Sequence, residues 1–252
     1  MTEYFVAKDS IVRQIWGKSD TILFIFAGAS AEFALNKAVD WLYFTGRLPA
    51  DPIGRLFSTV SYAKAILFSE KQAALRAIDS MTAIHSGIEA KRGVAIPDWA
   101  YRDVLFMLID YSIRSFEVLE RKLSIQEKTE VFQVFNRLGV RMKLTGLPNT
   151  FEAWTRMRNE HLKENLQVSK YTNDLFNQYK KHLGAFRYKI LLEAQKLVLP
   201  QRVKKLMGFR NTSLFLLIVK LYKASRMVNM DRVLKSFILP ARYKKQIKGL
   251  DQ

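Results

Sequence analysis

Apolar residues recur along most of this chain at steps of three and four positions. That spacing places them on one face of an α-helix and is typical of helices that pack in a bundle. The pattern and its breaks predict helices at about 9–17 and 21–35, from 52, at about 69–93, 98–122 and 124–143, from about 150, and at 169–183 and 185–198. The run 21–35 is apolar on nearly all sides, which places it at the centre. We therefore expect an all-α fold, a single-domain bundle of roughly ten or more helices.

The stretch from Asp51 to His85 carries residues capable of chemistry on two successive helices. Asp51 is a suitable N-cap and Pro52 suits the first turn, so the first of these helices begins here. Arg55 and Thr59 follow four residues apart. Residues at this spacing are neighbours on a helix surface, so the two side chains share one face.

The second helix of this stretch has an apolar stripe that a histidine interrupts. The stripe consists of Ala74, Ile78, Met81, His85 and Ile88. If the two helices are antiparallel, they could place His85, Arg55 and Thr59 around one cavity. A lone histidine on an apolar face is more often a core residue hydrogen-bonded to a carbonyl than a ligand, so periodicity alone leaves both interpretations open.

Several segments of the chain resemble one known family when they are taken in order. The run D-P-x-G-R-L-x-x-T occupies 51–59, and A-I-H-x-G follows at 83–87. Weaker similarities lie at 10–16, 27–29, 147–154 and 199–208. Together these segments resemble the MpaB-type oxygenase family, to which the latex-clearing rubber oxygenases are distantly related. The resemblance covers roughly residues 10–210.

This resemblance implies an all-α domain built around a pocket for a b-type haem. His85 stands where the family has its axial haem histidine, so the resemblance assigns it the iron. Arg55 and Thr59 match an arginine and a threonine that members carry near the haem. Arg55 could pair with a propionate or stabilise a developing oxygen anion, and Thr59 could hydrogen-bond bound oxygen or a water.

The chain departs from the family pattern at two places. Many bacterial members carry a Trp-Val-His element shortly after the first histidine, whereas this chain has an apolar run that ends in Asp110. We weigh two interpretations of Asp110: a buried carboxylate paired with Arg114, or a proton donor or polar anchor near the cofactor. The rubber-cleaving branch has a lysine where this chain has Ser58, which argues against rubber cleavage.

The composition excludes several other kinds of site. The 252 residues include no cysteine, which removes disulfides, thiolate haem ligation, iron–sulfur clusters and cysteine zinc sites. The only histidines are His85, His161 and His182, which argues against a zinc site of several histidines. Charged neighbours surround His161, and lysines precede His182, so we predict that both lie on the surface. Phosphate-binding glycine loops and the G-x-S-x-G and H-E-x-x-H motifs are also missing.

The net charge of +18 favours anionic partners. Beyond Pro200 the chain has many lysines and arginines, and the only acids are Asp231 and Asp251. Apolar runs lie between the basic residues. We predict a domain at 1–210 and basic amphipathic helices at 211–252, which pack on the domain or lie on an anionic membrane surface. Nucleic acid is a less favoured partner, because the cations alternate with aliphatic residues instead of stacking aromatics.

The sequence as a whole predicts a haem b-dependent oxygenase that uses O2 on a hydrophobic substrate of an isoprenoid or lipid-like class. The alternative is a non-catalytic helical protein that binds lipid on anionic membranes. A cytoplasmic location at a membrane periphery is expected, since neither a signal peptide nor an apolar run of about 20 residues is visible.

Overall fold

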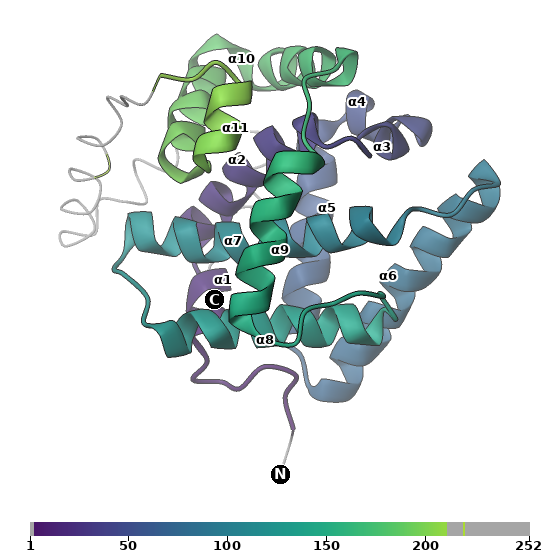
Figure 1. Ribbon diagram of the computed structural model, residues 1–252, viewed down its shortest axis with the longest axis vertical. Helices are drawn as coiled ribbons and strands as arrows, with labels where there is room; N and C mark the ends of the chain where they lie inside the picture. The colour runs from purple at the N-terminus through teal and green to yellow at the C-terminus, as the bar shows by residue number, and fades with distance from the viewer. Residues whose placement is uncertain (1–2, 211–218, 220–252) are drawn as a thin grey trace.

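A computed structural model describes residues 3–210 and residue 219 of the chain (Figure 1). The helices are α1 (Ile11–Trp16), α2 (Ser19–Leu35), α3 (Asp40–Phe44), α4 (Arg47–Ala50), α5 (Pro52–Leu67), α6 (Lys71–Arg92), α7 (Asp98–Leu119), α8 (Ile125–Arg141), α9 (Phe151–Glu164), α10 (Lys170–Val198) and α11 (Gln201–Leu206). Within the described residues there is no strand, only two isolated bridges. The predicted all-α, single-domain fold is confirmed. The predicted C-terminal helices at 211–252 lie outside the described residues, apart from Val219.

Helix α2 lies at the centre of the bundle, as its apolar sequence predicts, and packs against α7 and α10. Gly28 is a point of close approach between α2 and α7. A Cβ built at Gly28 would lie 2.3 Å from Cδ1 of Tyr111. Only a residue without a side chain permits this contact, so the glycine serves helix packing.

Local signals in the sequence set the ends of several helices. Asp51 caps α5, because its side chain accepts a hydrogen bond of 2.9 Å from the backbone N–H of Gly54. Gly93 ends α6 in the left-handed conformation, with φ 73°. Gly184, with φ 74° and ψ 165°, interrupts α10 and separates the two predicted helices.

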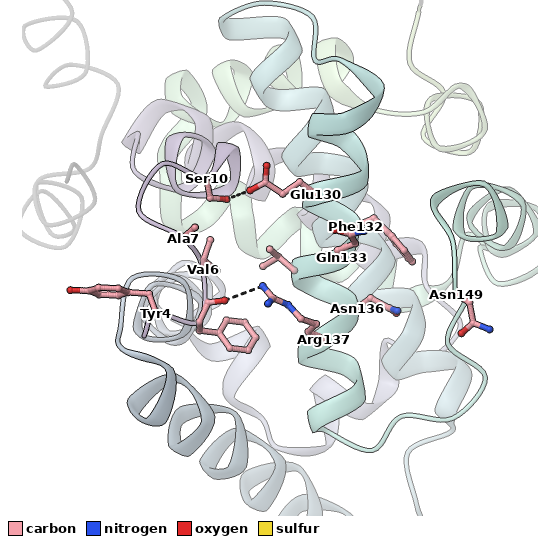
Figure 2. A pocket seen from close by; sticks show the side chains of 12 residues that line it. Tyr4, Val6, Ala7, Ser10, Glu130, Phe132, Gln133, Asn136, Arg137 and Asn149 are labelled. Carbon is pink, nitrogen blue, oxygen red and sulfur yellow. Dashed lines mark hydrogen bonds between the residues drawn. The ribbon is translucent and has the colours of Figure 1, made fainter. Parts of the chain in front are cut away.

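The N-terminal segment joins α6 and α8. Helix α6 begins at Lys71, two residues after the predicted start, where the Lys71 N–H donates to the carbonyl of Glu3. A surface groove of about 660 Å³ lies between the same segment and α8 (Figure 2). Figure 2 shows the Ser10 hydroxyl donating to Glu130 and the Arg137 guanidinium donating to the carbonyl of Phe5. These bonds hold the segment on α8, and none of the predicted site residues lines the groove.

Candidate functional site around His85

Helices α5 and α6 pack against each other and bring Arg55 close to His85. Both side chains are partly buried, and the Arg55 charge contributes to lowering the pKa of His85. Thr59 lies one turn after Arg55 on the same face of α5, and its hydroxyl donates a hydrogen bond of 3.2 Å to the Arg55 carbonyl. Arg55 therefore lies near enough to His85 for its charge to act on the imidazole, and Thr59 lies one turn further along α5.

One nitrogen of the His85 imidazole, Nδ1, is buried without a hydrogen-bond partner among the described residues. Burial and the Arg55 charge lower the pKa of His85, while Glu89 opposes them. The neutral imidazole is therefore the favoured form near neutral pH, and a neutral imidazole is the form that binds a metal.

Tyr101 of α7 holds one side of this imidazole. The two rings meet edge to face, with centroids 5.3 Å apart and planes at 69°. The Tyr101 hydroxyl donates to Oε1 of Glu89 at 3.1 Å, and the Ile96 N–H donates to the same oxygen at 2.8 Å. The link between α6 and α7 thus orients the ring that packs against His85.

The residues around His85 fit a haem. Among the described residues, no group of three His, Asp or Glu side chains could hold a metal ion. A haem iron needs fewer protein ligands, because the porphyrin supplies four nitrogens. A neutral imidazole could hold the iron, and an arginine such as Arg55 is the kind of cation that pairs with a haem propionate. Met81 and Ile88, on the same stripe, are only partly buried and could cover an apolar ring.

Asp110 lies in a different part of the bundle from His85. It is 7% exposed, and its carboxylate accepts hydrogen bonds from Arg114 at 2.6 Å and from Arg158 at 3.0 and 3.1 Å. On α7 it follows Tyr101 by nine residues, about 13 Å along the helix axis. This geometry favours the interpretation of a paired, buried carboxylate. A catalytic role for Asp110 stays a prediction without support from these contacts.

A buried charged cluster joins α2 to α9 and α7. The Arg158 guanidinium donates to both carboxylate oxygens of Glu32, at 2.5 and 2.7 Å, and the Tyr111 hydroxyl donates to Glu32 at 2.8 Å. Burial opposes ionisation of Glu32, but Arg158 and His161 outweigh it and lower the pKa to about 2. Glu32 is thus a buried anion with several donors.

The prediction that His161 lies on the surface is wrong. Its side chain is 2% exposed and lies between two carboxylates, with Nε2 3.0 Å from Glu32 and Nδ1 2.6 Å from Asp103. The charged neighbours on α9 suggest a solvated face, but His161 points from that helix toward α2. The sequence did contain a signal that another charged or polar side chain is buried here. Glu32 is the only charged residue in the apolar run 21–35, and a buried acid requires a partner. His182 is partly buried on α10.

Comparison with known proteins gives one result that bears on these residues. No curated protein and no solved structure matches the chain. A family model described as the catalytic domain of ER-bound oxygenase mpaB/B′ and rubber oxygenase matches residues 15–224, which includes Arg55, Thr59 and His85. Because this match covers most of the sequence, the chain belongs to the mpaB and rubber oxygenase family.

Proposed function

We propose that this chain is a haem b-dependent oxygenase in which His85 would hold the haem iron. The observation that carries the proposal is the partly buried imidazole of His85, which lies inside the region that the oxygenase family matches. Its Nδ1 has no hydrogen-bond partner among the described residues, and burial and the Arg55 charge lower its pKa. When bound, the haem would supply an iron centre that activates O2. The protein would supply the ligand, the orientation of that ligand and the polar groups around it.

Each residue near His85 would have a separate task. Arg55 would neutralise a haem propionate or a negative charge that develops on oxygen. Thr59 would offer its hydroxyl oxygen as an acceptor to a water or a polar substrate atom, since its proton is directed at the Arg55 carbonyl. Tyr101 would keep the imidazole in one orientation through ring packing, as ligand-orienting neighbours do in other metal sites.

We propose a hydrophobic substrate of an isoprenoid or lipid-like class. The name of the family supports this class, because rubber is a polyisoprenoid. The side chains beside His85 permit it: Met81 and Ile88 are partly buried, and Ile84 is 45% exposed. Ser58 argues against rubber itself as the substrate.

We also propose a cytoplasmic location at a membrane surface. Among the described residues, no helix has the length and apolar content needed to cross a membrane.

The absorbance of the protein purified with haem supplied tests the proposed cofactor and its ligand. We expect a Soret band near one haem per chain for the wild type and for His182→Ala. We expect the band to be lost or shifted in His85→Ala.

Each contrary result has a definite meaning. A wild type without haem would contradict the oxygenase proposal and favour the alternative of a non-catalytic lipid-binding protein. A Soret band that persists in His85→Ala would show that the protein binds haem but that His85 is not the iron ligand. His182 and Lys64 would then be the next candidates for that ligand.

A further inference from the structure

The interruption of α10 at Gly184 creates an exposed corner of the fold. Gly184 has a positive φ of 74°, and a Cβ placed there would meet nothing within 4 Å. Ala185 and Phe186 follow it and are exposed. Both parts of α10 lie at the end of the molecule opposite the N-terminus (Figure 1). We call residues 180–189 the α10 corner.

Phe186 is the most exposed large apolar side chain among the described residues, at 68%. Transfer of an aromatic ring from water to an apolar environment is favourable, so exposure of this size leaves free energy available for a partner. A single exposed apolar side chain is common on protein surfaces and is not evidence by itself. Its charged surroundings are what distinguish this one.

Exposed lysines flank Phe186 along the chain on both sides, and acids are almost missing from this part of the sequence. Lys180 and Lys181 precede the corner, and Lys189 lies three residues after Phe186, on the same helix face; all three are exposed. Between residues 175 and 210 the only acid is Glu193, which forms an ion pair of 2.5 Å with Lys196.

The cationic character continues into α11, which follows α10 along the chain and lies toward the same end of the molecule in Figure 1. Exposed cations there and just beyond it are Arg202, Lys205 and Arg210. Cations gathered at one end of a protein create a positive potential that attracts anionic surfaces. The α10 corner therefore combines a positive field with an aromatic side chain that projects into water.

We propose that the α10 corner binds an anionic lipid membrane, with Phe186 entering the boundary between headgroups and acyl chains. Interfacial binding of this kind needs apolar side chains that enter the membrane and lysines or arginines that meet anionic headgroups. Nucleic acid fits less well, because a strand is usually held by several stacking aromatics along a groove. This contact is separate from the predicted membrane contact of residues 211–252.

The position of the corner agrees with a substrate that comes from lipid. Helix α10 packs against α4 and α5, and Arg55 lies in the first turn of α5. A membrane bound at this end would therefore lie on the side of the molecule where α5 begins. Only this point rests on the proposed function; the membrane contact itself does not depend on haem.

A fluorescent label at position 186 of the full-length protein tests the contact directly. The chain has no cysteine, so Phe186→Cys introduces a single thiol that can carry an environment-sensitive dye. The matched control is Val140→Cys, a side chain that is 62% exposed. It belongs to α8, and Figure 1 shows α8 and α10 toward opposite ends of the molecule. Ala185→Cys provides a second site in the corner.

With vesicles of phosphatidylcholine and phosphatidylserine, we expect the dye at 186 and at 185 to shift its emission to the blue. We expect no shift at 140 and none with phosphatidylcholine alone. Replacing Lys180, Lys181 and Lys189 by glutamine should lower the vesicle partition coefficient about fivefold for each lysine.

Three results would overturn the proposal: no binding to the anionic vesicles, binding without a shift at 186 and 185, or an equal shift at 140. A shift caused by a DNA oligonucleotide and not by vesicles would assign the corner to nucleic acid instead. Haem absorbance of the same samples reports on the proposed function independently, so either idea can fail alone.

Discussion

Burial and two charged neighbours, Arg55 and Glu89, shift the pKa of the His85 imidazole. Burial and Arg55 lower its pKa, and Glu89 acts in the opposite direction from one turn further along α6. Tyr101 contacts both the ring and Glu89, so the orientation and the protonation of His85 depend on the same small group. A ligand role requires the neutral form, and these contacts favour that form without any cofactor.

We expect Arg55→Gln to raise the pKa of His85 and Glu89→Gln to lower it, because each change removes one of these charges. Proton NMR titration measures this in the haem-free protein, where three histidines give few resonances and His85→Gln assigns the relevant one. Lys91→Gln, which removes an exposed cation later on α6, is the control and should leave the titration unchanged. If the pKa measured from the His85 resonance stayed the same in both variants, the electrostatic explanation of this site would be wrong.

At the scale of elements, the charged cluster around Glu32 connects α2, α7 and α9. It consists of Glu32, Asp103, Asp110, Tyr111, Arg158 and His161. Burial alone would lower the pKa of His161, but Asp103 and Glu32 reverse this and raise it above the usual 6.5. Protonated His161 thus offsets part of the negative charge that the carboxylates bring into the core.

We expect the free energy of unfolding to fall as pH rises through the folded-state pKa of His161. A raised pKa means that the folded protein binds this proton more tightly than the unfolded chain does. The stabilisation is complete below pH 6.5 and is lost above the folded-state pKa. Urea unfolding at a series of pH values from 6 upward measures it.

Two variants separate this effect from other titrating groups. His161→Gln should remove this pH-dependent part of the free energy of unfolding, whereas His182→Gln should retain it. An unchanged pH dependence in His161→Gln would contradict the assignment of the proton to this residue.

At the scale of the whole molecule, the fold places the proposed haem site and the α10 corner on helices that pack together. Helix α5 carries Arg55 and Thr59 and contacts both α6 and α10. Arg55 and His85 come from two different helices, and a ligand that binds only the folded chain stabilises the fold as a whole, so haem binding should stabilise the bundle and not only the site.

We expect haem to raise the free energy of unfolding of the wild type by about 2.7 kcal/mol when free haem is about 100 times its Kd. His85→Ala should show little of this stabilisation, and His182→Ala should show all of it. Thermal unfolding with and without haem, followed by circular dichroism, measures the change. Equal stabilisation of wild type and His85→Ala would mean that haem binds without this ligand.

The sequence by itself determined the long helices, most of their ends and the positions of Arg55, Thr59 and His85 along two of them, but it did not predict the short helices α3, α4 and α11. Helical periodicity and caps such as Asp51 and Gly93 act over a few residues, so they can be predicted from local pattern. The nearness of Arg55 and His85 was also predictable, because α5 and α6 are consecutive and antiparallel neighbours are usual.

Only the tertiary structure decided which charged residues are buried together. Glu32 meets Arg158 and His161 across 126 and 129 residues of chain. The local composition of α9 is that of a solvated face, and the rotation of α9 toward α2 depends on packing of the whole bundle. The same holds for Asp110, whose apolar surroundings suggest burial but do not reveal that Arg158 is its partner. Periodicity specifies which residues share a face; the arrangement of the other helices decides what that face meets.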